Sequence, residues 1–523
     1  MVGWEKQVKK NRWFWLGMAA ILVVSLALRF WGLGRFNTLV FDEVYYANFA
    51  SKFLQGRQEF GGHPPLSTYL IAGGIWISEQ LGWGSEATRN GLTGLYISTV
   101  SYRWLNALTG AWIPLVVGAI AFQLTHRRTY ALIAALLMAL DGMFLVESRY
   151  ALNNVYLVLF GLLGHLGLLI ALNRVSAPQG KSRSLLFPLV LSGVGFGASI
   201  GIKWNGAGFV LGAIALWVLA WIVKWVRPQL LDRPALPMAA TDATAEARLD
   251  SEPSQWRSPL AALPQLKLWQ VALTFGVIPA ITYYVSWLPY AALNPEVSVW
   301  EWQGQVLSYH ERVGGMDAHP YCSRWLSWLW MIRPVAYFYQ TAHAPGEPSP
   351  IVGPPLPNEA GRIIYDVHAM GNPPLWWAST LAIAVVLGLV VLRGGQAIAR
   401  SRGDGHAIAP FAATGFPVSV HPLTWVWTAV FLCINWGANF LPWAKVTRCT
   451  FIYHYMGSLV FAILAIALLV DGWLDSLRGW HRVVALTTVL VVALGFIFWL
   501  PLFLGLPISP ADMQTRRWFA SWI

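Results

Sequence analysis

The chain has 523 residues, of which 56% are hydrophobic and only 11% carry a charge. A soluble domain carries about 25% charged residues, so the composition excludes an ordinary soluble protein and indicates a polytopic membrane protein. The net charge of +12 does not indicate nucleic-acid binding, because the basic residues lie between apolar runs rather than in one patch. The 31 tryptophans fit aromatic belts at membrane interfaces.

About eleven apolar runs are candidate membrane-spanning helices, since about 20 apolar residues cross a bilayer. In chain order they lie near residues 14–33, 104–123, 129–147, 153–172, 187–203, 207–226, 268–290, 374–392, 424–441, 452–470 and 483–503. The run 66–78 is too short to span and predicts an interfacial or re-entrant helix. The expected fold is one all-α polytopic membrane domain over residues 1–523, with two long loops that carry short interfacial helices.

Lysine and arginine predict the orientation. If the N-terminus is cytoplasmic, the loops on that side hold 20 of the 36 basic residues, in keeping with the positive-inside rule. The long loops 34–102 and 291–373 and the C-terminus then lie outside. Residues 228–266, rich in Pro, Ala and Asp, read as a cytoplasmic linker. The polar motifs gather on the outer face, so we expect the chemistry there.

Two adjacent acids, Asp42 and Glu43, follow the first apolar run by about ten residues. Acids beside a membrane span are costly to place and are functional candidates by default. Because neighbours in an extended segment point in different directions, one could be a general base while the other binds substrate or a metal ion. The alternative is a helix N-cap followed by a first-turn glutamate.

Several basic groups lie at the outer ends of apolar runs. Arg29 and Arg103 together suggest an anionic ligand, because the guanidinium fork suits phosphate; alternatively each snorkels to the interface. Lys203 and Trp204 could bind substrate or anchor the fifth run. Elsewhere, Asp141, Glu147 and Arg149 could form a structural ion-pair network as readily as a catalytic group.

The remaining polar candidates are His310, His319, His454 and a Tyr- and Trp-rich run at 319–330. No two histidines have the i, i+4 spacing of a zincin, so a zinc site is not predicted. The aromatic rings could stack on sugars or anchor to lipid headgroups, the commoner role. Of the three cysteines, Cys322 and Cys449 could meet outside the membrane, but their spacing favours unpaired thiols.

Eight motifs in order resemble the bacterial branch of the protein O-mannosyltransferases, polytopic enzymes of the GT-C class. Each motif is short, but together they extend almost from end to end of the chain. They are FDEVYY at 41–46, HPPL at 63–66, ESRYALNN at 147–154, IKWNG at 202–206, HPYCSRWLSW at 319–328, GNPPLWW at 371–377, FIYHY at 451–455 and RRWFASWI at 516–523.

The resemblance implies transfer of mannose from a polyprenyl-phosphate-mannose donor to Ser or Thr hydroxyls of exported proteins, with inversion at the anomeric carbon. Asp42 matches the acid that deprotonates the acceptor, and Glu43 matches its neighbour, which positions acceptor or sugar. Arg29 and Arg103 match arginines near the donor phosphate, where positive charge stabilises the leaving group. Further substrate contacts are expected from His63, Arg149, Lys203, Trp204, His319, Tyr321 and His454.

No cofactor is required on this interpretation, although paired acids leave a divalent cation possible. The expected partners are the lipid-linked donor, the exported acceptor proteins and the lipids of a bacterial plasma membrane, and not nucleic acid. The loop 291–373 is too short for the β-trefoil MIR module of eukaryotic members. Asn154 and Tyr45 depart from the family pattern, which has an acid and often a histidine there.

Two other functions are compatible with parts of the sequence. A related GT-C enzyme could use another polyprenyl-phosphate sugar or a lipid acceptor. A transporter would carry charges near the bilayer midplane, often in two repeated halves. Here the charges cluster at one face and no repeat is visible, so the sequence favours an enzyme.

Overall fold

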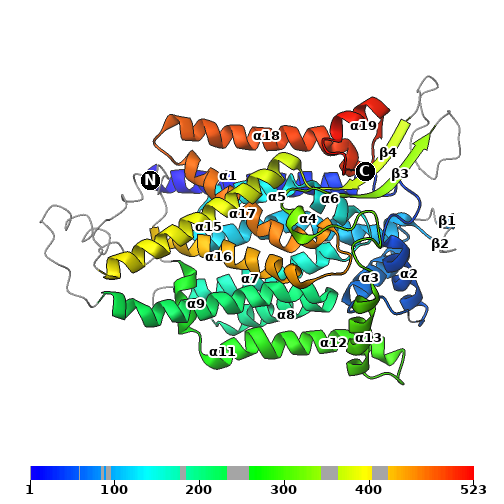
Figure 1. Ribbon diagram of the computed structural model, residues 1–523, viewed down its shortest axis with the longest axis horizontal. Helices are drawn as coiled ribbons and strands as arrows, with labels where there is room; N and C mark the ends of the chain where they lie inside the picture. Colours follow the sequence, from blue (N-terminus) through cyan, green and yellow to red (C-terminus); the bar gives the residue numbers. More distant parts are fainter. Residues whose placement is uncertain are drawn as a thin grey trace, which may run out of the picture.

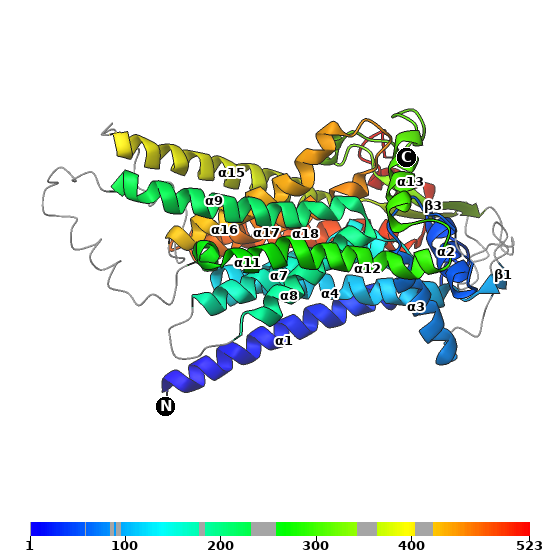
Figure 2. The ribbon, with the colours of Figure 1, turned by 90° about the horizontal axis from the view of Figure 1, so that it is seen from below.

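A computed structural model describes residues 2–57, 59–83, 88–89, 96–176, 184–231, 258–342, 363–402 and 422–522. The molecule is an elongated bundle of roughly parallel helices with a cap of short elements at one end (Figure 1). The N-terminus lies at the opposite end from this cap, and the C-terminus lies within it, in both views (Figure 2).

The long helices coincide with the apolar runs of the sequence. They are α1 (Val2–Phe30), α4 (Thr99–Thr125), α5 (Arg128–Ala139), α6 (Gly142–Arg149), α7 (Asn154–Val175), α8 (Leu186–Ile202), α9 (Ala207–Leu231), α11 (Leu268–Ala272), η4 (Leu273–Val277), α12 (Ile278–Ala292), α15 (Pro373–Arg402), α16 (Pro422–Phe440), α17 (Met456–Leu474) and α18 (Gly479–Leu504).

A helix therefore lies at each of the eleven predicted runs, but not every one of these helices is long enough to cross a bilayer by itself. Among the described residues, eight helices are long and apolar enough to cross a bilayer, or nine if the bent pair α5–α6 is one span. The pair bends by 59°, and α8 has only 17 residues. The multi-span fold is confirmed, while the count of eleven stays a prediction.

The bend between α5 and α6 has a local cause. Asp141 leaves the helical conformation, and its carboxylate caps α6 by accepting a hydrogen bond of 2.9 Å from the Phe144 N–H. A capping aspartate starts a new helix because it satisfies an N–H group that has no intrahelical partner. As a result, α6 turns away from α5 and carries Glu147 toward the capped end of the bundle.

The core of the bundle runs along α7 and α17. In the apolar segment of α17, 83% of the residues are buried, compared with 22% in that of α1 and 28% in that of α18. α18 and the α11–α12 segment lie at opposite edges of the bundle (Figure 1). The exposed leucines and valines of these outer helices are the surface that a membrane would cover.

The short elements form the cap. The helices are α2 (Glu43–Leu54), α3 (Leu66–Gln80), α13 (Val299–Arg312), α14 (Trp325–Trp328) and α19 (Pro510–Arg516), with 3₁₀ turns η1 (Trp204–Gly206), η6 (Leu441–Lys445) and η7 (Ile452–Tyr455). The 3₁₀ turn η3 (Pro259–Gln265) lies outside the cap, because it leads directly into α11 and packs against α7 and α9. It follows the segment 232–257, which with 343–362 and 403–421 lies outside the described residues. Most of the predicted linker 228–266 falls there.

Two small sheets depart from the all-α prediction. β1 (Thr88–Arg89) pairs with β2 (Tyr96–Ile97), and β4 (Ile363–Ala369) lies between β3 (Val335–Ala342) and β5 (Pro507–Ile508), all antiparallel. Aromatic and β-branched residues dominate β3 and β4, as is usual for half-buried strands. The sheet joins the loop 291–373 to the chain end, and α13 and α14 confirm the short helices predicted in that loop.

Candidate active site

The two adjacent acids at the start of α2 have different surroundings. Glu43 is completely buried and accepts four hydrogen bonds of 2.7–2.8 Å. Two come from the guanidinium of Arg103, and the others come from the N–H groups of Val40 and Ala151. The carboxylate is saturated, so Glu43 has no free lone pair with which to take a proton from a substrate.

Arg103 is also saturated. Besides its two bonds to Glu43, it donates to the carbonyls of Leu33, Phe36 and Thr38 at 2.8–3.0 Å. A guanidinium has five N–H groups, and all of its nitrogens are engaged here. We call Glu43, Arg103 and Arg149 the scaffold cluster. Arg149 belongs to it because it donates to four carbonyls at the end of α1 and just beyond, at 2.8–3.1 Å.

The scaffold cluster fixes the loop that presents Asp42. Both arginines bind carbonyls between Leu28 and Thr38, so this non-helical segment has its polar groups satisfied inside the protein. Phe41 takes a left-handed conformation with φ 51°, which is costly for a bulky residue. Its ring stacks on Tyr337 with centroids 4.0 Å apart, and this packing holds the turn that aims Asp42.

Asp42 stands at the N-cap of α2, but its side chain makes no capping hydrogen bond. Its carboxylate accepts no hydrogen bond from any described residue. Burial raises the pKa of Asp42 from 3.8 to about 6, although the nearby Lys203 ammonium opposes the rise. A partly exposed carboxylate with this pKa is an effective base near neutral pH.

Lys203 interacts electrostatically both with Asp42 and with a buried acid, Glu147. Its ammonium donates to the Asn154 side-chain oxygen at 3.1 Å, and the Asn154 amide donates to Glu147 at 3.1 Å. Tyr337 donates to the other oxygen of Glu147. Burial lowers the pKa of Lys203 to about 8, while the charges of Glu147 and Asp42 oppose the shift. The ammonium therefore stays mostly protonated at neutral pH.

A second cation approaches from the loop before η7. Arg448 is half-buried. Burial lowers the pKa of His63, His310 and His454, and the charge of Arg448 lowers it further. The rings of His63 and His310 lie 5.2 Å apart, and burial is the main reason that the pKa of His310 falls to about 4. We call Asp42, Lys203, Arg448, His63 and His310 the open cluster. It unites two cations, two neutral imidazoles and one unpaired carboxylate.

Family models match most of the chain. The model for the dolichyl-phosphate-mannose-protein mannosyltransferases matches residues 19–236, and that for the C-terminal four-span region of protein O-mannosyltransferases matches residues 296–522. The chain belongs to the protein O-mannosyltransferase family. The predicted resemblance is thereby confirmed.

Individual relatives agree with this assignment. Polyprenol-phosphate-mannose–protein mannosyltransferases of Mycolicibacterium smegmatis and Corynebacterium glutamicum are 25% and 24% identical, covering 97% and 96% of this chain and 93% and 92% of theirs. Protein O-mannosyl-transferase 1 of Rattus norvegicus is 32% identical over 196 residues, which are 36% of this chain and 26% of the relative.

Among solved structures, the S. cerevisiae protein O-mannosyltransferase Pmt1-Pmt2 complex bound to the sugar donor matches with a TM-score of 0.62. The match covers 98% of this chain and 92% of the yeast chain at 13% identity. At that identity the likeness concerns the fold, and it confirms the GT-C type of architecture predicted for this family member.

The structure brings only part of the predicted substrate set together. Asp42, His63 and Lys203 lie in the open cluster, and His454 lies behind it, buried between the rings of Trp328 and Trp443 at 6.0 and 4.6 Å. His319 and Tyr321 are further out in the cap, with rings 5.4 Å apart. The His319 ring lies 5.5 Å from the ring of Phe451, which lies 5.4 Å from the ring of Tyr453.

Three of the predicted basic groups make hydrogen bonds within the protein. Arg103 and Arg149 bind protein oxygens with most of their donors, as described above. Arg29 is fully buried and donates to Ser25, while its Nε and Nη2 have no hydrogen-bond partner among the described residues. Trp204 donates from its indole to the Tyr283 hydroxyl at 2.9 Å and lies 6.1 Å from the His310 ring.

Two other expectations were wrong. Asp141, Glu147 and Arg149 form no ion pair with one another, because each turns to a different partner: a helix N-terminus, Tyr337 with Asn154, and backbone carbonyls. Cys322 and Cys449 are not free thiols but a disulfide with Cα atoms 5.1 Å apart. Folding brings two distant loops together, which residue spacing alone does not reveal.

No metal site accompanies the paired acids in the described part of the chain. There, no three His, Cys, Asp or Glu side chains are grouped so that they could hold a metal ion. Asp42 and Glu43 cannot supply a pair of ligands, since Glu43 is saturated. The positive charge at the open cluster comes from Lys203 and Arg448.

Sequence reasoning missed Arg448, Tyr337 and Tyr453. The Tyr453 ring faces the Lys203 ammonium at 5.4 Å. Tyr453 belongs to the FIYHY motif at 451–455 but was not singled out within it, and Arg448 lies outside the eight motifs. Tyr337 lies on β3, a strand that hydropathy did not predict. The one local signal at Arg448 is its position directly before Cys449.

Proposed function

We propose that this family member is an inverting glycosyltransferase that moves mannose from a polyprenyl-phosphate-mannose donor to Ser or Thr hydroxyls of exported proteins. The observation that carries the proposal is the open cluster, in which one unpaired carboxylate lies near the Lys203 ammonium and Arg448 lies near Lys203. The named relatives act with polyprenol-phosphate-mannose on proteins, and this chain covers more than nine-tenths of their length.

We assign the proton transfer to Asp42 and the stabilisation of the leaving group to Lys203 and Arg448. The Asp42 carboxylate accepts the proton of the acceptor hydroxyl, whose oxygen then attacks the anomeric carbon. The bond from that carbon to the phosphate oxygen breaks on the opposite face, so the configuration inverts. The leaving polyprenyl phosphate keeps the electron pair, and Lys203 with Arg448 stabilises its charge in a site of low dielectric. The proton ends on Asp42, and the electron pair leaves with the polyprenyl phosphate.

The other cluster residues bind or orient substrate. We assign His63 and His310 to the sugar, since neutral imidazoles both donate and accept hydrogen bonds to hydroxyls. Glu147 and Asn154 orient Lys203 through the contacts given above. His454 supports the wall of the site through its neighbouring rings, and His319 with Tyr321 lies where an acceptor polypeptide would approach. Glu43, Arg103, Arg149 and Trp204 position these groups without touching substrate.

We further propose that the capped end of the bundle faces the exported side of a bacterial plasma membrane. Three observations support this orientation: the disulfide, which persists in oxidising compartments; the basic loops on the other side; and the termini at opposite ends (Figure 2). Residues 34–102 and 291–373 then lie outside and the segment 228–266 lies in the cytoplasm, all within a single membrane domain.

The direct test is a transfer assay. Membranes containing the protein are incubated with labelled polyprenyl-phosphate-mannose and a Ser/Thr-rich peptide, with Asp42→Asn membranes as the control. Label on the peptide that disappears in the variant is the expected result. Label on membrane lipid alone would favour a lipid acceptor. Transfer from other polyprenyl-phosphate sugars but not from polyprenyl-phosphate-mannose would show that the donor carries a different sugar.

A further inference from the structure

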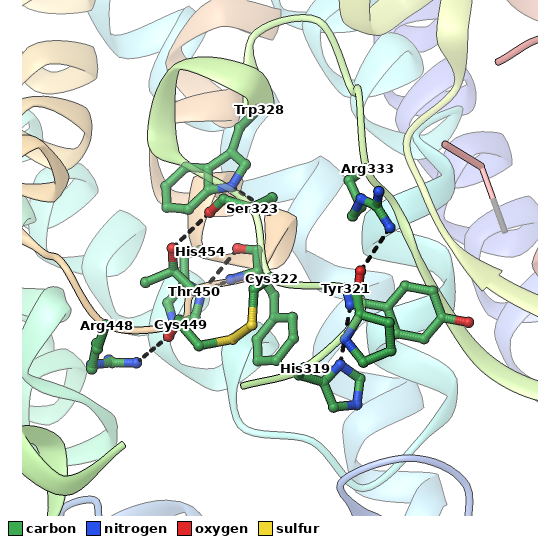
Figure 3. Close-up of a disulfide and its surroundings, with 12 residues drawn as sticks. His319, Tyr321, Cys322, Ser323, Trp328, Arg333, Arg448, Cys449, Thr450 and His454 are labelled. Atoms are coloured by element: carbon green, nitrogen blue, oxygen red, sulfur yellow. Dashed lines mark hydrogen bonds between the residues drawn. A yellow bond between two sulfur atoms is a disulfide. The ribbon is translucent and has the colours of Figure 1, made fainter. Parts of the chain in front are cut away.

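The disulfide joins two loops of the cap that are far apart in sequence. One loop follows α13, and the other precedes η7; their cysteines are separated by 127 positions. Beside the sulfur atoms, the Ser323 N–H donates to the Thr450 carbonyl at 2.7 Å and the Thr450 hydroxyl donates to the Ser323 carbonyl at 2.8 Å (Figure 3). The Cys449 N–H also donates to the Gly314 carbonyl at 2.8 Å.

Arg448 is attached to this junction. It is the residue next to Cys449, and its guanidinium donates to the Cys449 carbonyl at 2.9 Å (Figure 3). On its other side, the residues 444–447 are all exposed. The part of the chain that fixes Arg448 is therefore the disulfide-bonded side, from Cys449 onward.

We propose that the Cys322–Cys449 disulfide positions Arg448 for the donor phosphate, so that the contribution of this arginine to donor binding depends on the covalent bond. This inference rests on the function proposed above. Hydrogen bonds inside a protein replace hydrogen bonds to water and contribute little net free energy, even between buried residues such as Ser323 and Thr450, whereas a covalent link does not exchange. Without it, the loop can place the guanidinium in water, where the phosphate gains little from it.

The bond itself needs an oxidant. Two thiols lose two protons and two electrons when the disulfide forms, and a protein dithiol–disulfide oxidant of the exported compartment is the class of reactant that receives them. Cys322 and Cys449 are both buried in the finished fold. Formation of the bond therefore belongs to folding and maturation, after the loops have crossed the membrane.

The experiment is an epistasis test on affinity for a polyprenyl phosphate. Cys322→Ala, Cys449→Ala and the double variant are each made in the wild-type and in the Arg448→Met background. We expect the three cysteine variants to lose the same factor of about ten in affinity, the size of one charge-assisted contact. In the Arg448→Met background the cysteine changes should add nothing. Cys433→Ala, which removes the free thiol of α16, is the matched control and should bind normally.

A second measurement uses the folded wild-type protein. Reduction and alkylation should lower the affinity by the same factor, and reoxidation before alkylation should restore it. If the affinity losses of the cysteine variants multiply with the loss in Arg448→Met, the disulfide has a merely structural role and the inference is overturned. Free thiols at 322 and 449 in protein purified without reductant would also overturn it. If Arg448→Met binds polyprenyl phosphate with wild-type affinity, the assignment of Arg448 to the phosphate in the proposed function is wrong. This outcome is distinct from a failure of the disulfide inference.

Discussion

Asp42 and Glu43 are neighbours in the chain, yet they belong to two regions with opposite electrostatics. In the scaffold cluster, Glu43 has an arginine and two N–H groups as partners, and all three side-chain nitrogens of Arg103 donate hydrogen bonds. In the open cluster, Asp42 has no hydrogen-bond partner among the described residues, and the cations Lys203 and Arg448 have donors to spare. The difference separates a carboxylate that holds the fold from one that can accept a proton.

The contrast between the two acids also shows why a charged residue at a membrane surface can be either structural or catalytic. A buried ion pair is costly to break but adds little net stability compared with an apolar alternative, so it serves mainly to fix geometry. Here it fixes the loop that ends in Phe41 and presents Asp42. A catalytic carboxylate needs the reverse condition, namely burial enough to raise its pKa and an unpaired oxygen directed at the substrate.

The largest effect is expected from breaking the scaffold cluster. Arg103→Met leaves the Glu43 carboxylate buried without a counter-ion, which should lower the free energy of unfolding by about 3–5 kcal/mol. Thermal unfolding in detergent measures the change, with the exposed Arg57→Met as control. An Arg103→Met protein with a normal melting temperature and no donor binding would move Arg103 to the phosphate, as the sequence first suggested.

Removing a cation of the open cluster should affect binding more than folding. Lys203→Met and Arg448→Met should each weaken polyprenyl phosphate binding by about 1.5–3 kcal/mol, because each loses a hydrogen bond between charged groups. Calorimetric titration measures the affinity, and Lys445→Met, an exposed lysine three positions from Arg448, is the matched control. Wild-type affinity in both variants would place the phosphate elsewhere.

The sequence predicted the two regions unequally. Hydropathy located all the long helices, because burial in lipid requires apolar runs of a set length. It also placed Asp42, His63 and Lys203 at the same end. It could not pair Glu43 with Arg103, 60 positions away, or Cys322 with Cys449, because such contacts depend on how the helices pack. Arg103 and Arg448 carry the same charge in the sequence, and only the packing decides that Arg103 has all its donors paired while Arg448 has donors to spare.

The pH dependence sharpens the role of Asp42. The pKa of its carboxyl is raised to about 6, and only the deprotonated form is a base. Turnover should therefore fall about tenfold per pH unit below 6 and level off above it. In Lys203→Met the opposing ammonium is lost, so the falling limb should move to higher pH. Rates that stay constant from pH 5 to 7 would contradict a base with this pKa.

The smallest effect is expected at Trp204. Trp204→Phe removes the hydrogen bond to Tyr283 that connects η1 with α12, at a cost of about 1 kcal/mol in stability. Transfer per folded molecule should change little, since the indole N–H is already occupied. A large loss of transfer at unchanged melting temperature would instead identify Trp204 as a substrate contact.

The account depends most on the difference between the two neighbouring acids. Single-turnover transfer from preloaded donor to a Ser/Thr-rich peptide, normalised to folded protein, compares Asp42→Asn with Glu43→Gln. We predict that Asp42→Asn loses a factor of about 10²–10⁴ while its melting temperature and polyprenyl phosphate affinity stay near wild type. Glu43→Gln should melt earlier but transfer at a comparable rate per folded molecule. An Asp42→Asn protein that transfers mannose at the wild-type rate would contradict the account.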